Sequence, residues 1–279
     1  MTSLSGGRIF GCFSSGCMAL STVVVMRHGE STWTDASVNR FAGWVDVPLT
    51  ERGRAQAAHA GALLKSAGLR PDVCFTSLLR RSIVSAQIAL DAVDRLWVPT
   101  ERTWRLNERH YGAFQGQTRP AMRERYGEEL FSAYRRSFDV RPPEIDTASP
   151  YFQGHDERYC PDGLDGADPS QIRAESLADV VVRLRPWWQA RVEPLVAAGR
   201  TVLIVTHGSV VRAIKKELEG LGAKEISQVN IPTGVPLTYE FECSGRQGER
   251  PRVIGAGSYL DPDAARAGIA AVNQLGRAQ

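Results

Sequence analysis

Two apolar segments that each end in His-Gly constrain the fold of this chain more than any other feature. Residues 23–29 read Val-Val-Val-Met-Arg-His-Gly, and residues 201–208 read Thr-Val-Leu-Ile-Val-Thr-His-Gly. Short runs of β-branched residues are typical of parallel strands that are buried on both faces. Ligands of open α/β sheets bind beyond the carboxyl ends of such strands. If the two strands are neighbours, we therefore expect His28 and His207 to face one crevice.

The residues around the first histidine suit the transfer of a phosphoryl group. Arg27 can hold a phosphate with two hydrogen bonds and stays charged at any working pH. A neutral His28 ring can act as a nucleophile, and Gly29 lets the backbone pass close to a ligand. A strand that ends in an ordinary polar turn would explain this segment alone. The repeat at residues 207–208, where a helix N-terminus attracts anions, favours phosphoryl transfer through a histidine.

The composition is that of a soluble globular protein. Of the 279 residues, 43% are hydrophobic and 23% are charged, which fits one large α/β domain or two small ones. The net charge of +3 is too small to indicate nucleic-acid binding, and we expect no membrane span. The five cysteines are scattered without a CxxC pair. We therefore expect neither a disulfide framework nor a metal site, and a cytoplasmic location.

The N-terminal segment resembles a signal peptide only weakly. Arg8 precedes a moderately apolar stretch at residues 9–25, but no small-x-small cleavage site comes before the first strand. We therefore expect residues 1–21 to form a flexible extension and residues 22–279 to form a single catalytic domain.

The remaining chain alternates between strand and helix patterns, which predicts right-handed βαβ units and a parallel sheet. Pro186 is expected to kink a long helix over residues 175–196. The Pro-, Gly- and Asp-rich residues 139–173 lack periodicity, which indicates a functional excursion such as a lid. Other expected elements are strands within 72–76, 97–104 and 226–242, the last interrupted at 231–236, helices from the N-cap Thr50 to Gly68 and over 78–93, 118–137 and 210–218, and a weakly helical tail over 261–279.

Two sets of motifs together resemble a known protein family. The first set resembles the histidine phosphatase superfamily and consists of Arg-His-Gly-Glu-Ser at 27–31, Thr-Ser at 76–77 with Arg81, Leu-Asn-Glu-Arg-His-Tyr-Gly at 106–112 and His-Gly at 207–208. The second set is similar to the 2,3-bisphosphoglycerate-dependent phosphoglycerate mutases of that superfamily and lies at 41–46, 135–136, 154–156, 230–234 and 258–261. The resemblance covers residues 23–279.

The resemblance implies a phosphoglycerate mutase-like fold, three layers of α/β/α with a mostly parallel central sheet. It also implies a lid-like insertion at residues 139–173 and a mobile tail at residues 258–279. By the same resemblance, His28 is the nucleophile that becomes phosphohistidine, and Glu108 is the general acid and base. The residues implied around the phosphoryl group are Arg27, Arg81 and His207. The residues implied to bind substrate are Ser31, Thr34, Ala42, Gly43, Tyr111, Arg119, Arg135, Arg136, Gly208 and Ser209.

The sequence departs from the family pattern at three of these positions. Thr34 and Ser209 stand where the family has asparagine, and Arg119 stands where it has lysine. The loop over residues 35–38 is also about two residues longer than in the family. A lost hydrogen bond to a charged group costs roughly 1.5–3 kcal/mol. The departures therefore leave the substrate less certain than the chemistry.

The leading hypothesis is a phosphoglycerate mutase that interconverts 3-phosphoglycerate and 2-phosphoglycerate without a metal, primed by 2,3-bisphosphoglycerate. The alternative is a phosphatase, or a mutase that acts on a different small phosphorylated metabolite. A non-catalytic anion-binding relative is the third hypothesis. The implied partner is a small phosphorylated carboxylic acid, and the resemblance implies a homodimer or homotetramer.

Overall fold

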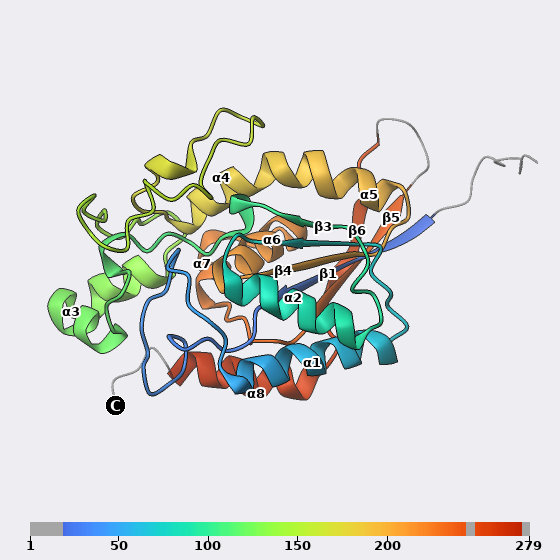
Figure 1. Ribbon diagram of the computed structural model, residues 1–279, viewed down its shortest axis with the longest axis horizontal. Coiled ribbons are helices and arrows are strands. Elements are labelled where there is room, and N and C mark those ends of the chain that lie inside the picture. Colours follow the sequence, from blue (N-terminus) through green and yellow to red (C-terminus); the bar gives the residue numbers. More distant parts are fainter. Residues whose placement is uncertain (1–18, 244–248, 275–279) are drawn as a thin grey trace, which may run out of the picture.

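A six-stranded sheet forms the centre of the computed structural model, which describes residues 19–243 and 249–274 (Figure 1). The strand order is β3-β2-β4-β1-β5-β6, and the first four strands in this order pair in parallel. β5 runs antiparallel to both β1 and β6, so the predicted, mostly parallel sheet is confirmed. The strands are β1 (Ala19–Arg27), β2 (Val73–Thr76), β3 (Thr100–Arg102), β4 (Val202–Thr206), β5 (Leu237–Cys243) and β6 (Arg252–Tyr259).

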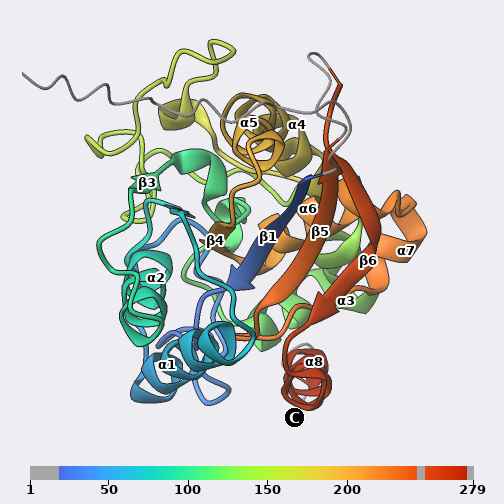
Figure 2. The same cartoon turned by 90° about the vertical axis from the view of Figure 1, so that its right-hand side faces the viewer.

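Helices cover both faces of the sheet, which confirms the predicted three layers (Figure 2). They are α1 (Glu51–Ser66), α2 (Arg80–Ala92), α3 (Arg119–Arg136), α4 (Leu177–Trp187), α5 (Glu193–Ala197), α6 (Gly208–Glu219), α7 (Ala223–Gln228) and α8 (Pro262–Gln274). Alternate residues of β1 enter opposite cores because strand side chains alternate between the two faces. Val23 and Val25 pack in the core beneath α4 and α6, whereas Val24 and Met26 pack in the core beneath α1 and α2.

The predicted helices are present with small shifts at their ends. Thr50 is the N-cap of α1, and its side chain accepts a hydrogen bond from the backbone N–H of Gly53. Pro186 lies within α4 and does not end it. The following residues, Trp188–Val192, form a π-helical turn before α5. The expected long helix is therefore present, with its irregularity just after the proline.

Two predicted boundaries are wrong. Ala19–Ser21, which we assigned to the extension, are part of β1, while residues 1–18 lie outside the described residues. Within the expected strand over 226–242, Ile226 lies in α7 and strand structure starts only at Leu237. The backbone N–H of Gly222 donates to Glu225 at 2.6 Å and marks the start of α7, a capping signal that the strand interpretation overlooked.

The sequence prediction also missed β6. This edge strand is largely exposed and has glycines at positions 255 and 257, so it carries no apolar alternation. Ser258 and Tyr259, which we assigned to the tail, belong to β6, and the tail beyond them forms α8. In the described part of the chain, no helix has the length and apolar character needed to cross a membrane.

Residues 139–173 run over the surface with a single 3-10 turn, at Pro169–Gln171, in agreement with the expected excursion (Figure 1). The buried side chain of Arg105 ties this excursion to the domain. Its Nε donates to Asp162 at 2.5 Å, and its Nη2 donates to Asp165 at 2.6 Å. Because one guanidinium group holds two carboxylates of the excursion, we expect it to limit the motion of that segment.

We predict that Arg105→Met loosens the excursion without unfolding the protein. The free energy of unfolding should fall by roughly 1–3 kcal/mol, since the two carboxylates left behind are partly exposed. Limited proteolysis within residues 157–166 should become faster. Arg102→Met, at an exposed position in β3, is the matched control. Equal cleavage of the Arg105 variant and the control would contradict the anchoring role.

Candidate active site

The pairing of β1 with β4 brings the two His-Gly turns together. Arg27 lies opposite Thr206 in the parallel register, and the N–H of His28 donates to the carbonyl of Thr206 at 2.9 Å. The ring centroids of His28 and His207 are 4.9 Å apart in an edge-to-face arrangement. The two strands are therefore neighbours, which is the condition under which we expected both rings to face one crevice.

His28 is held as a neutral ring with one nitrogen available for reaction. Its Nδ1 lies 2.5 Å from the carbonyl oxygen of Gly29, so Nδ1 carries the hydrogen and Nε2 keeps its lone pair. The Nε of Arg81 donates to Nε2 at 3.2 Å. Burial, with Arg81 and Arg27 adding positive charge, lowers the pKa of His28 well below its ordinary value. An unprotonated Nε2 is the form of the ring that can attack phosphorus.

Gly29 has a packing role that the sequence did not reveal. A Cβ atom at this position would lie 2.0 Å from the carbonyl oxygen of Gly53, and a Cβ at Gly53 would lie equally close to the carbonyl of Glu30. The two glycines let the first turn of α1 pack against the loop after β1. Our interpretation that Gly29 lets the backbone pass close to a ligand is therefore wrong. The absence of a side chain at Gly29 instead makes room for α1.

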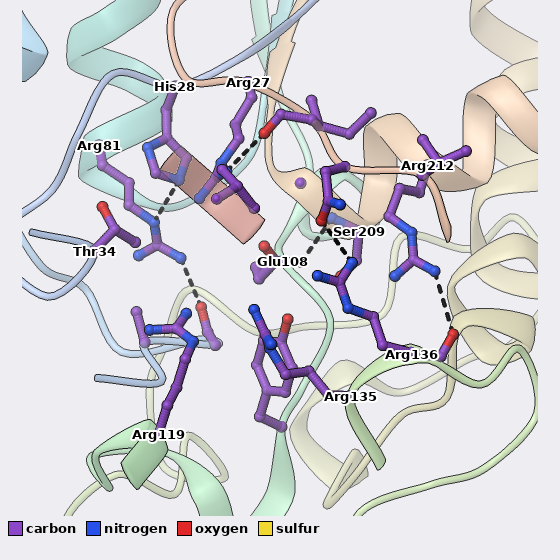
Figure 3. Close-up of a pocket in the computed structure, with 18 residues that line it drawn as sticks. Arg27, His28, Thr34, Arg81, Glu108, Arg119, Arg135, Arg136, Ser209 and Arg212 are labelled. Carbon is purple, nitrogen blue, oxygen red and sulfur yellow. Dashed lines mark hydrogen bonds between the residues drawn. The ribbon is translucent and has the colours of Figure 1, made fainter. Parts of the chain in front are cut away.

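A pocket opens at this edge of the sheet (Figure 3). Most of the predicted site residues line it, and they come from separate loops and helices: Arg27, His28, Thr34, Ala42, Gly43, Arg81, Glu108, Tyr111, Arg119, Arg135, Arg136, Gly208 and Ser209. Ser31 and His207 do not line it. The pocket also includes residues that we did not predict, namely Arg212, Val229, Asn230, Ile231 and Val272.

The two predicted residues outside the lining support it from behind. The hydroxyl of Ser31 is buried and lies 3.0 Å from that of Thr34. His207 is fully buried against His28, and its Nε2 lies 2.7 Å from the hydroxyl of Ser77. That hydroxyl also accepts the N–H of Leu79 at 3.1 Å, which fixes its position. The structure therefore places His207 beside His28 rather than on the pocket wall.

The pocket is strongly cationic. Six guanidinium groups line it, from Arg27, Arg81, Arg119, Arg135, Arg136 and Arg212, and among the described lining residues Glu108 alone carries a carboxylate. Burial and the neighbouring Arg119 and Arg136 lower the pKa of Arg135 to about 9. An anion in the pocket would relieve this crowding of positive charge.

Three of the arginines that line the pocket have an unpaired nitrogen atom. In the described part of the chain, the buried Nε atoms of Arg27, Arg119 and Arg212 have no hydrogen-bond partner. Buried polar groups without partners are uncommon. Within the same residues, no group of three or more histidine, cysteine or acidic side chains is arranged to hold a metal ion.

Glu108 is held at the pocket wall by two backbone N–H groups. Its Oε1 accepts from the N–H of Arg109 at 2.8 Å and from the N–H of Ser209, in the first turn of α6, at 3.1 Å. Its own carbonyl accepts from the indole of Trp44 at 2.6 Å. A carboxylate fixed beside the nucleophile can move a proton to or from a substrate hydroxyl.

Two of the three departures from the family pattern, Thr34 and Arg119, have different consequences in the structure. The Thr34 hydroxyl accepts the N–H of Ser31 at 2.8 Å, so it closes its own turn. Arg119 donates through Nη1 to the side chain of Asn39 at 2.8 Å, and its guanidinium lies 4.8 Å from the ring centre of Phe41. These two side chains are held partly by the loop over residues 31–41 and not only by the pocket.

Two of the missed residues join α8 and α6 to the site. Arg212 follows Gly208 by one helical turn and therefore projects from the same face of α6, a spacing that could have revealed it. The Asn230 side chain accepts from Arg136 at 2.6 Å and donates to Asn273 of α8 at 2.6 Å. Val272 reaches the pocket from α8, and no local pattern signals that contact.

Comparison with known proteins identifies the family. The model of the histidine phosphatase superfamily (branch 1) matches residues 23–159 and 153–250. The chain belongs to the histidine phosphatase superfamily. It is 50% identical over 255 residues to a 2,3-bisphosphoglycerate-dependent phosphoglycerate mutase of Bifidobacterium longum, covering 91% of this chain and 98% of the relative.

Further relatives are consistent with this membership. A 2,3-bisphosphoglycerate-dependent phosphoglycerate mutase of Corynebacterium jeikeium is 48% identical over 258 residues, which is 92% of this chain and 96% of the relative. Among solved structures, a mycobacterial glucosyl-3-phosphoglycerate phosphatase in complex with VO3 superposes with a TM-score of 0.61. That likeness covers 85% of this chain and 98% of the phosphatase at 22% identity, and it shows the shared fold alone.

We predict that buried neutral histidines make the protein less stable in weak acid. Burial lowers the pKa of His28 and His207 well below 6.5 and that of His110 to about 4. The unfolded chain binds protons below pH 6.5 while these rings stay neutral in the folded protein. Stability should therefore fall as the pH drops from 6.5, by about 1.4 kcal/mol per pH unit for each ring.

The measurement is the free energy of unfolding in urea between pH 7 and 5. His110→Gln should remove one of these contributions and flatten the slope by about 1.4 kcal/mol per pH unit, whatever its effect on stability at pH 7. A slope in the His110 variant equal to that of the unmodified protein would contradict the buried neutral ring.

Proposed function

We propose that this protein is a 2,3-bisphosphoglycerate-dependent phosphoglycerate mutase. The observation that carries the proposal is the extent of the cationic pocket. Arg27 and Arg81 lie beside His28, and further guanidinium groups line the same pocket on α3 and α6. A phosphatase needs cations only around the phosphoryl group, whereas a mutase must also hold a second anionic end of its substrate. The names of the relatives at 48–50% identity support the same activity.

The proposed reaction uses a phosphorylated His28. The carboxylate of Glu108 takes the proton of the free hydroxyl of the bound phosphoglycerate. The hydroxyl oxygen then bonds to phosphorus as the bond between phosphorus and Nε2 of His28 breaks. Reversal at the other phosphoryl group restores phosphohistidine, and the leaving oxygen takes the proton back from Glu108.

The arginines of the pocket stabilise charge during this transfer. Arg27 and Arg81 face the oxygens of the transferred group, where negative charge develops. Arg119, Arg135, Arg136 and Arg212 would hold the carboxylate and the remote phosphate. When bound, 2,3-bisphosphoglycerate supplies the phosphoryl group that first loads His28, and the unpaired Nε atoms of the pocket suit its charge.

The direct test is an assay with 3-phosphoglycerate, with and without trace 2,3-bisphosphoglycerate. We expect 2-phosphoglycerate to form only when the bisphosphate is present, with little free phosphate. Release of phosphate without 2-phosphoglycerate would instead assign a phosphatase. Formation of neither product would refute both enzymatic activities.

We also predict that His28→Ala abolishes phosphorylation by labelled 2,3-bisphosphoglycerate. The label should be acid-labile in the unmodified protein, as expected for phosphohistidine, because Nε2 of His28 is the atom that bonds to phosphorus. His155→Ala removes an exposed histidine and should label at the normal rate. Retained acid-labile label in the His28 variant would refute this assignment of the nucleophile.

A further inference from the structure

A buried ion pair lies behind Glu108 and outside the residues that line the pocket. Arg183 of α4 donates through Nε to the Oε1 of Glu175 at 2.6 Å and through Nη2 to its Oε2 at 3.2 Å. Both side chains are about 95% buried, with exposed fractions of 5% and 4%. Neither has a part in the proposed reaction. A buried pair of this kind is weak evidence of stabilisation by itself, so its neighbours must explain it.

The remaining hydrogen bonds of Arg183 go to the backbone on either side of the catalytic carboxylate. Its Nη2 donates to the carbonyl of Asn107 at 2.7 Å and to that of Glu108 at 3.2 Å. Its Nη1 donates to the carbonyls of Arg105 and Trp104. One guanidinium group thus donates to four backbone carbonyls within residues 104–108.

Glu175 holds the other side of the same segment. Its Oε2 accepts the N–H of His110 at 2.8 Å, and its own N–H donates to the carbonyl of His110 at 2.8 Å. Glu108 therefore lies between two backbone points that Arg183 and Glu175 fix. Arg183 and Glu175 hold the backbone at Glu108 but do not contact its carboxylate.

This support matters because Glu108 lies in irregular backbone. Residues 108–111 belong to no helix or strand, so no ladder of backbone hydrogen bonds sets their position. A general acid must reach its proton partner within about 2.6–3.2 Å, and a displacement of about 1 Å can cost on the order of 100-fold in rate.

We propose that Arg183 is a positioning residue for Glu108 and that Glu175 orients Arg183. The inference rests on the proposed function, in which Glu108 moves the proton. When the lone pair of His28 Nε2 bonds to phosphorus, the phosphorus–oxygen bond of the donor breaks. The leaving oxygen takes a proton from the carboxyl group of Glu108, which becomes a carboxylate. Arg183 places that carboxyl group and takes no proton itself.

A double-mutant cycle tests this role. The rate of phosphohistidine formation from labelled 2,3-bisphosphoglycerate is measured in single turnover for the unmodified protein, Arg183→Lys, Glu108→Gln and the double variant. Lysine keeps the charge but loses the planar fork. We expect Arg183→Lys to slow the reaction at least about tenfold in the unmodified background and less than about twofold in the Glu108→Gln background.

Controls separate positioning from general destabilisation. Arg185→Lys changes an exposed arginine two positions along α4 that pairs with Glu217, and it should not alter the rate. If Arg183→Lys does not fold, as judged by thermal unfolding, Glu175→Gln replaces it in the cycle with the same expectation. An equal loss in both backgrounds, or no loss in either, overturns the proposal.

The same experiment distinguishes a failure of the mutase proposal from a failure of the positioning role of Arg183. Labelling of His28 without conversion of 3-phosphoglycerate to 2-phosphoglycerate would overturn the mutase function and leave the cycle interpretable, because the cycle measures only the first transfer. Absence of any labelling in the unmodified protein would overturn both.

Discussion

The parallel pairing of β1 with β4 is the interaction on which the rest of this molecule depends. It aligns Arg27 with Thr206, so that the next residue of each strand is a histidine at the same edge of the sheet. Burial of both strands then withdraws those rings from water and keeps them neutral. The neutral state of His28, the proposed nucleophile, thus depends on the core that surrounds it. The same burial opposes stability in acid, because the fold must keep the rings unprotonated.

Positive charge at this edge is held in place by contacts away from the pocket. Arg81 donates to the carbonyls of Gly43 and Val45, and Arg119 donates to the side chain of Asn39 and the carbonyl of Arg40. Each guanidinium group therefore has part of its hydrogen-bonding capacity committed to backbone and part left for a ligand. Such pre-organisation suits phosphoryl transfer, where placing charge matters more than covalent participation. In the role proposed for it, Arg183 extends the same principle to Glu108.

Sequence reasoning succeeded where local patterns express the physics directly. The buried strands 23–26 and 202–206 follow from their β-branched runs, and the first-turn cap at Thr50 follows from its side chain. It failed where tertiary contacts decide the outcome. The exposed strand β6 has no apolar alternation, and Ile226 is buried by a short helix that apolar content alone could not distinguish from a strand. Val272 enters the site only because α8 packs there.

The site residues show the same difference between local patterns and tertiary contacts. Several residues that line the pocket form compact motifs, because a strand end and a helix start place neighbouring residues together, as at 27–28 and 208–209. The residues that hold the pocket lining in place do not form such motifs. Arg183 reaches the backbone at Glu108 from 75 positions along the chain, and Ser77 reaches His207 across 130. A buried side chain that donates to backbone carbonyls depends on the three-dimensional fold and leaves no local sequence pattern. The support of an active site is therefore harder to find in a sequence than its chemistry, although both must be in place before a proton can be transferred.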